Sequence, residues 1–259
     1  HLETVFGNTA VQTSADVQPM QTHYAFTCGD VDLKVTFTAP LFMEDLKLLS
    51  RPVNYLTYSV AARDGREHEV EVYFEASPRW ALDQPYQQSA SKGYEADGLL
   101  YLKSGSKEQN ILAKQGDDLR IDWGYFYMVA GKENTAYSVG NSTELRKNFV
   151  NGTLNSASLE GEDSNGNMAL VRSHGKVKNV TDKIMLGYDD IYSIQYFGTN
   201  LRPYWNSKGD RTIEAEMLAA YNEYDKLLAR CYAFDKKLME DASAAGGKEY
   251  AELCALAYR

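Results

Sequence analysis

Two adjacent carboxylates lie inside the most aromatic stretch of the chain. Residues 183–205 read KIMLGYDDIYSIQYFGTNLRPYW, and Asp189 and Asp190 directly follow Tyr188 in this run. Aromatic side chains are mostly buried, and burying a carboxylate costs free energy unless it is paired or hydrogen-bonded. Burial also raises the pKa of a carboxylate, which can make it a general acid. Asp189 and Asp190 are therefore candidate catalytic residues.

A structural role is the favoured alternative for this pair. Neighbouring residues of a strand point to opposite faces, so Asp189 and Asp190 would not act together in an extended segment. In a turn they could converge. The structural interpretation has them capping turns or accepting backbone N–H groups where the strand-rich part of the chain meets a helix.

Asp122 is a third candidate, because it precedes Trp123 in another apolar stretch. Here too a structural role is favoured. The rings of Tyr188, Trp123 and Trp205 are candidates for binding a ligand beside these acids.

Other aromatic residues in the strand-rich part suggest a sugar-stacking platform. Trp80, Tyr125 and Tyr127 could form it, although at least half of any alternating set must belong to the core. A core role is favoured for these rings.

Patterns for other catalytic chemistry are weak. The four histidines are dispersed and lie in no catalytic signature, and no G-x-S-x-G elbow is present. Isolated glycines form no phosphate-binding loop. We expect no cofactor. The histidines are His1, His23, His68 and His174.

Metal-binding patterns are weak as well. Three dispersed cysteines, Cys28, Cys231 and Cys254, suit neither a disulfide framework nor a zinc site, and they are expected to be buried free thiols. Residues 160–167 (EGEDSNGN) place oxygen ligands at alternate positions, as calcium loops do, but the glycine is misplaced for an EF-hand. A solvated loop is favoured, and no metal is expected.

The bulk composition excludes two classes of partner. The 259 residues contain no apolar run of the roughly 18 residues that a membrane span requires. The formal charge of −9 and the scattered basic residues argue against binding a nucleic-acid backbone. We expect neither a nucleic-acid partner nor a membrane span in this chain.

Period-two alternation predicts a chain built mainly from strands. In VDLKVTFTA, which begins at Val31, apolar and polar residues alternate, and Gly29-Asp30 and residues 63–66 read as hairpin turns. A short edge strand is expected near residues 2–6, 78–97 is expected to be a loop, and 131–166 is expected to hold one or two short strands and long loops. These features predict an antiparallel β-sandwich. The clearest expected strands are 23–28, 31–39, 54–62, 68–76, 99–103, 119–130 and 168–173.

The pattern changes after Pro203. A long helix is predicted from Asp210, its candidate N-cap, to the breaker pair Gly246-Gly247. One sandwich could not cover so long an apolar stripe, so an exposed apolar face is expected, with residues 248–259 as the next helix. The expected domains are 1–207 and 208–259. The apolar positions recur at steps of three or four at Ile213, Met217, Ala220, Tyr224, Leu227, Cys231, Phe234, Leu238 and Ala242.

Four sequence blocks carry a family resemblance. They are SRPVNYLTYSV at 50–60, GDDLRIDWGY at 116–125, LGYDDIYSIQYF at 186–197 and the stretch from CYAFDKK to the end at 231–259. In this order they resemble the N-terminal region of the glutaminase A-like family, multidomain hydrolases of fungi and of Bacteroides-type bacteria. The resemblance implies a supersandwich-like β-sandwich followed by the first helix of a truncated α/α toroid-type domain, similar to six-hairpin glycosidase-like proteins.

The family name implies hydrolysis of L-glutamine to L-glutamate and ammonia. The resemblance makes this chain a non-catalytic structural domain that would be inactive alone. It implies two partners, the remainder of its own helical domain and a small-molecule substrate in the parent protein. It also implies a secreted or periplasmic location. The alternatives are a carbohydrate-binding or glycosidase-associated module, because glycosidases use this architecture widely, and a pure interaction scaffold.

Overall fold

The computed structural model describes residues 8–117, 119–154 and 166–259. The expected edge strand near residues 2–6 lies outside the described residues, as does the acidic loop 160–167 apart from its last two residues. Strands hold 41% of the residues and helices 27%. The prediction of a mainly β chain is therefore confirmed.

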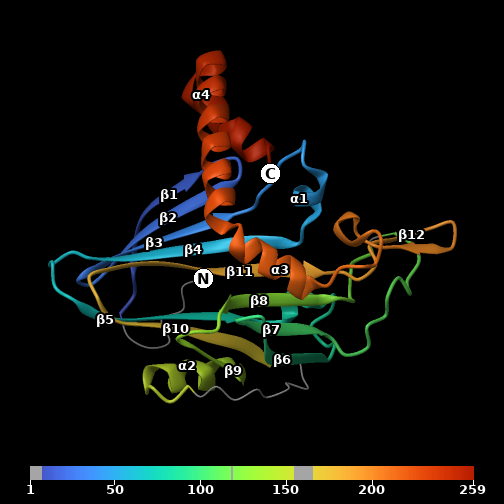
Figure 1. The fold of residues 1–259 in the computed structure, drawn as a ribbon, viewed down its shortest axis with the longest axis horizontal. Helices are drawn as coiled ribbons and strands as arrows, with labels where there is room; N and C mark the ends of the chain where they lie inside the picture. The colour runs from blue at the N-terminus through green and yellow to red at the C-terminus, as the bar shows by residue number, and fades with distance from the viewer. Residues whose placement is uncertain (1–7, 118, 155–165) are drawn as a thin grey trace.

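A large antiparallel sheet forms the body of the molecule (Figure 1). A smaller antiparallel sheet, in the order β5-β10-β9, packs on one of its faces. The strands of the large sheet, in spatial order, are β1 (Val11–Val17), β2 (Gln21–Cys28), β3 (Val31–Thr38), β4 (Val53–Ala62), β11 (Asn179–Asp189), β8 (Tyr125–Gly131), β7 (Leu99–Ser106) and β6 (Ser89–Ala96). Those of the small sheet are β5 (His68–Ala76), β10 (Asn167–Val177) and β9 (Thr135–Gly140).

The two sheets enclose an apolar core. Leu56 and Ile184 of the large sheet join Met168 and Leu170 of the small sheet in one buried cluster. Alternating apolar residues on both inner faces supply the area whose burial stabilises the sandwich. The predicted antiparallel β-sandwich is confirmed.

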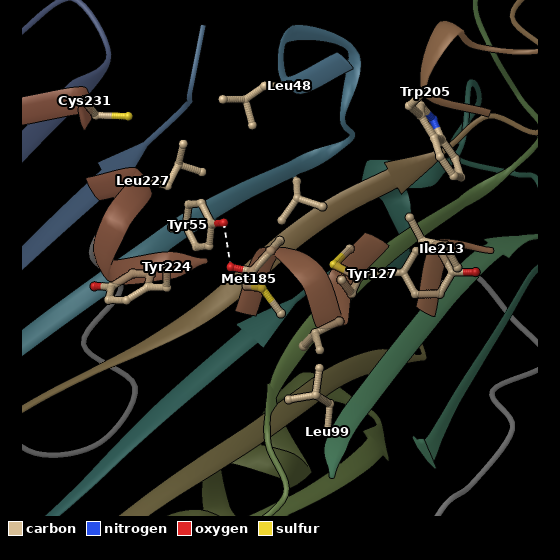
Figure 2. Close-up of a cluster of buried hydrophobic side chains, with 14 of the residues drawn as sticks. Leu48, Tyr55, Leu99, Tyr127, Met185, Trp205, Ile213, Tyr224, Leu227 and Cys231 are labelled. Atoms are coloured by element: carbon tan, nitrogen blue, oxygen red, sulfur yellow. Dashed lines mark hydrogen bonds between the residues drawn. The ribbon is translucent and has the colours of Figure 1, made fainter. Parts of the chain in front are cut away.

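The other face of the large sheet carries the C-terminal helices α3 (Ile213–Asn222) and α4 (Tyr224–Ala257). Figure 2 shows Tyr55 and Met185 of the sheet packed beneath residues of these helices. The hydroxyl of Tyr55 donates to the carbonyl of Ala220 at 2.8 Å, which fixes the end of α3 on the sheet.

The long C-terminal helix is confirmed, with two corrections. Asp210 is not the N-cap, because the side chain of Thr212 accepts from the N–H of Ala215 at 3.2 Å. The helix is also interrupted at Glu223, where α3 ends and α4 begins, and α4 then runs past β1 and β2 with its far end projecting beyond the sheets (Figure 1). Gly247, with φ 82°, interrupts α4 at the predicted breaker pair.

Several shorter elements differ from the sequence prediction. The stretch 119–124 is not a strand, because β8 begins only at Tyr125 after Gly124 adopts φ 77°. The stretch 78–97, which was expected to be a loop, contains the strand β6, and β1 was not predicted. The short strand β9 lies in 131–166, where one or two short strands were expected. The remaining elements are α1 (Leu46–Ser50), η1 (Pro78–Ala81), α2 (Ser142–Val150), β12 (Ile194–Tyr196), β13 (Thr199–Leu201) and η2 (Tyr204–Asn206).

The far end of α4 leaves apolar surface exposed, as expected from its length. Leu253 and Leu256 of α4 are each 61% exposed. An apolar groove of about 840 Å³ lies between the two parts of α4. Whether this helix opens a toroid-type domain, and whether 207/208 is a domain boundary, stay predictions. None of the helices in the described ranges is both long and apolar enough to span a bilayer.

Candidate functional site

A cavity of about 380 Å³ lies where β11 ends and the chain leaves the large sheet. It is lined by five of the six residues that the sequence singled out, which come from three separate stretches of the chain. These five are Trp123, Tyr188, Asp189, Asp190 and Trp205. Strand pairing explains the assembly, because Asp189 of β11 is opposite Tyr125 of β8 and so brings the segment before β8 to the same end of the sheet.

Both carboxylates of the cavity help to shape the turn that follows β11. Asp189 Oδ1 accepts from the N–H of Ile191 at 3.0 Å, and Asp190 Oδ2 accepts from the hydroxyl of Ser193 at 2.6 Å. In the described chain, no hydrogen bond is found to the second oxygen of either carboxylate. One oxygen of each is therefore used structurally, and the other is available to a ligand.

The surroundings of Asp189 shift its pKa upward. Burial raises the pKa of this carboxyl above its ordinary value, and the adjacent charge of Asp190 adds to the effect. The N–H of Ile191 and the ammonium of Lys103 act in the opposite direction. A carboxyl with a raised pKa in a cavity is a candidate proton donor.

Trp123 and Gly124 hold the turn against the sheet. The Trp123 indole N–H donates to the carbonyls of Asp190 at 2.7 Å and Tyr192 at 2.9 Å. A Cβ at Gly124 would lie 2.3 Å from the carbonyl oxygen of Asp189, so only glycine allows the two backbones to approach this closely. Sequence reasoning missed Gly124, although its place directly after Asp122-Trp123 was a usable signal.

Trp205 connects the cavity to the core beneath the helices. It lies on η2, is 4% exposed, and belongs to the same buried cluster as Ile213 and Met217 (Figure 2). The cavity therefore lies between the sheet and the beginning of the helical part.

The structure places Asp122 outside this cavity. Its neighbours Ile121 and Trp123 line the cavity, whereas the Asp122 side chain is 1% exposed and pairs with Lys114 Nζ at 2.7 Å. Gln87 also donates to it at 3.2 Å. The arrangement is that of a buried, paired carboxylate that fastens a loop.

The rings of the suggested sugar platform separate into two groups. Trp80, which is 57% exposed, and Tyr125 line the cavity, whereas Tyr127 is 2% exposed and belongs to the core. The histidines that the structure describes stay apart: His174 bonds Tyr58 at 2.7 Å, and none lines the cavity. In the described part of the chain, no three His, Cys, Asp or Glu side chains come together as a metal site.

The fold and the cavity define a β-sandwich domain with an aromatic, acidic cavity at its junction with a helical segment. Residues 20–241 match the family model described as "Domain of unknown function (DUF5127)", and the chain belongs to this family. Glutaminase A of Aspergillus oryzae (strain ATCC 42149 / RIB 40) is 26% identical over 269 residues. The match covers 97% of this chain but 38% of the Aspergillus protein, so the chain spans well under half of that relative's length. The resemblance to the glutaminase A-like family is confirmed.

Solved structures give a weaker comparison. Heparan sulfate lyase HepC from Pedobacter heparinus and a mutant of that lyase each match with a TM-score of 0.33 and 5% identity. Each match covers 70% of this chain and 22% of the lyase. We infer neither fold nor function from it.

Proposed function

We propose that the chain is the N-terminal structural domain of a glutaminase A-like hydrolase. The parent reaction would convert L-glutamine and water to L-glutamate and ammonia. The 26% identity to the Aspergillus protein named glutaminase A, over nearly the whole chain, is the observation that carries this proposal.

The chain alone is proposed to be inactive on glutamine. Hydrolysis of glutamine needs a nucleophile or an activated water, a proton donor for the leaving ammonia, and donors for the oxyanion, and a Ser, Thr or Cys nucleophile needs a base within hydrogen-bond reach. Ser50 is the one serine or threonine that lines the cavity in the described chain, and its hydroxyl donates to the carbonyl of Lys47 instead of a base. Among the described residues that line the cavity, no Lys, Arg, His or Cys accompanies the two carboxylates.

The proposed role of the sandwich is to brace the helical part and to form one wall of the parent protein's site. The cavity at the end of β11 has the right position for this role, because Trp205 and Pro203 of its lining lead directly into α3. The remainder of the helical domain would be the partner. A secreted or periplasmic location, which the resemblance implies, is part of the proposal.

Ammonia release from L-glutamine tests the proposal. We expect a full-length protein that contains this sequence to release ammonia, and residues 1–259 alone to release none. Asp189→Asn and Asp190→Asn in the full-length protein should lower kcat/KM if the cavity walls the site. Turnover by residues 1–259 alone would contradict the non-catalytic role, and a full-length protein inactive on glutamine would contradict the parent reaction.

A carbohydrate-binding module is the second candidate. Its supporting observation is that Trp80 and Tyr188, with 57% and 46% of their surfaces exposed, line the same cavity as two carboxylates. Aromatic faces can stack on sugar rings while carboxylates accept from their hydroxyls. Binding on a glycan array without glutamine turnover by the full-length protein would favour this candidate over the first.

A further inference from the structure

The cavity at the end of β11 has an unbalanced charge. Asp189 and Asp190 are its two ionisable carboxylates, and no Lys, Arg or His is among the described residues that line it. An anionic ligand would meet repulsion there. A cationic ligand would meet both carboxylates, each of which has one oxygen that accepts no hydrogen bond from the described chain.

Lys103, whose ammonium group lowers the pKa of Asp189, contacts aromatic rings instead of this carboxylate. Lys103 lies over the ring of Tyr125 with its Nζ 3.6 Å from the centroid, and 5.7 Å from that of Tyr127. It lines a separate cavity of about 180 Å³, and in the described residues it forms no ion pair with Asp189. The pairing of Lys103 with Tyr125 also shows that an aromatic ring of this region already accepts an ammonium group on its face.

The remaining walls are aromatic rings held in fixed positions. Phe126 packs against both Trp80, at 5.4 Å between centroids, and Tyr188, at 5.1 Å. Trp80 and Tyr188 therefore share one buried neighbour while about half of each remains exposed. The indole N–H of Trp123 is used by backbone carbonyls, so its ring offers a ligand its face and not its donor.

We infer that this cavity binds an organic ammonium group, with the carboxylates of Asp189 and Asp190 as the counter-charge and the aromatic rings as cation–π walls. Aromatic walls favour a weakly hydrated organic cation over a metal ion, which would require more oxygen ligands. The volume of about 380 Å³ suits a small amine, since ligand pockets usually measure about 300–1,000 Å³. The inference rests on the cavity alone and does not depend on the proposed glutaminase role.

The chain offers a direct readout. Its three tryptophans, Trp80, Trp123 and Trp205, all line the cavity, so the intrinsic tryptophan fluorescence of residues 1–259 reports on its occupant. Choline and its neutral isostere 3,3-dimethylbutanol differ in the charge and not in the shape of the head group. We expect choline to change the emission saturably and to bind at least about tenfold more tightly than the alcohol.

Substitutions test which residues supply the effect. Asp189→Asn should weaken choline binding about tenfold or more, and Tyr188→Leu, which keeps the charge, should weaken it severalfold. Asp210→Asn removes one carboxylate at an exposed position outside the cavity and should leave the affinity within twofold. Circular dichroism checks that each variant is folded. If Asp189→Asn does not fold, Asp190→Asn is used in its place.

Three results would overturn the inference. They are equal affinity for choline and 3,3-dimethylbutanol, absence of saturable binding of choline, and unchanged affinity in folded Asp189→Asn and Tyr188→Leu. Methyl glucosides serve as a further probe, and tighter binding of these sugars than of choline would assign the cavity to a carbohydrate. Ammonia release is measured separately, so failure of this inference is distinct from failure of the glutaminase proposal.

Discussion

The indole nitrogen of Trp123 lies 2.7 Å from the backbone carbonyl oxygen of Asp190 and donates a hydrogen bond to it. This bond joins the segment before β8 to the turn after β11. Ile191, which follows Asp190, has φ 60°, an unfavourable conformation for a β-branched residue. Such strain persists only where the surroundings enforce it, and it is often found at functional sites. Trp123 is therefore the clamp that holds the two cavity carboxylates in place.

Loss of this clamp should destabilise the fold. Trp123→Phe keeps a ring in the cavity wall but removes the indole N–H that donates to the carbonyls of Tyr192 and Asp190. We expect the free energy of unfolding, from urea titration, to fall by about 1–3 kcal/mol. Trp80→Phe is the control, because Trp80 is 57% exposed, and it should change stability by less than about 0.5 kcal/mol. Equal effects of the two substitutions would contradict the clamp.

Gly124 tests whether the backbone after β11 must lie in direct contact with the segment before β8. Gly124→Ala combines a positive φ of 77° with a Cβ that would lie 2.3 Å from the Asp189 carbonyl oxygen. Gly65→Ala is the matched control, because Gly65 has φ 74° and nothing within 4 Å of the added Cβ. We expect Gly65→Ala to cost about 1 kcal/mol and Gly124→Ala at least about 2 kcal/mol more in thermal or urea unfolding. Similar losses in the two variants would show that the turn can move away from Gly124.

The fold was predictable where the local pattern and the tertiary environment agree. The alternation that begins at Val31 predicted β3, because Leu33 and Val35 on one face of that strand pack against the core. β6 escaped prediction because its sequence, SASKGYEA, is rich in small and polar residues, and its pairing with β7 decides its conformation. The break at Glu223 escaped because apolar residues keep the helical period on both sides of the bend.

The candidate site was predictable only in part, for a similar reason. Tyr188, Asp189 and Asp190 are consecutive, so their joint position followed from the chain. The approach of Trp123 depends on the register between β11 and β8, which no local pattern specifies. Asp122 lies outside the cavity and contacts Lys114 and Gln87, and no local pattern specifies these long-range contacts.

Asp235 should make stability depend on pH. This side chain of α4 is 3% exposed and accepts from the N–H of Met20 at 2.8 Å, while its Oδ2 has no partner in the described chain. Burial raises its pKa to about 6, against the opposing effects of the Met20 N–H and Arg259, and Asp16 raises it further. The folded state therefore binds the proton more tightly than the unfolded state.

The difference between the folded and unfolded pKa of Asp235 determines how stability changes with pH. The contribution of Asp235 is fully present below the unfolded pKa of 3.8 and is lost as the pH rises through about 6. Relative to Asp235→Asn, the wild-type chain should lose about 2 kcal/mol of unfolding free energy between pH 4.5 and pH 7.5. Asp241→Asn, at an exposed position of the same helix, gives the baseline for removing one carboxylate. If the difference in unfolding free energy between the wild-type chain and Asp235→Asn did not change with pH, the raised pKa of Asp235 would be excluded.

A buried ion pair fastens α3 beside the cavity, and its loss should be costly. Glu216 of α3 lies 3.2 Å from Arg51 Nε, with side chains 3% and 7% exposed, and Arg51 immediately precedes Pro52 of the cavity wall. Glu216→Gln leaves the Arg51 charge buried with Glu223 as its remaining carboxylate, at 2.9 Å. Breaking a buried pair costs about 3–5 kcal/mol, and we expect a loss near 3 kcal/mol because Glu223 remains.

Glu223→Gln is the matched control for this pair. Glu223 contacts the same arginine but is 54% exposed, so its substitution should cost less than about 1 kcal/mol. Salt should reduce the effect of the exposed pair and leave the Glu216 effect largely unchanged at 0.5 M NaCl, since buried charges are screened little. A double-mutant cycle with Arg51→Met, followed by urea unfolding, measures the coupling of Arg51 to each glutamate. The prediction would be contradicted if the coupling free energy of Arg51 were the same with Glu216 as with Glu223. It would also be contradicted if the Arg51–Glu216 coupling disappeared in salt, because the pair would then behave as a solvent-exposed one.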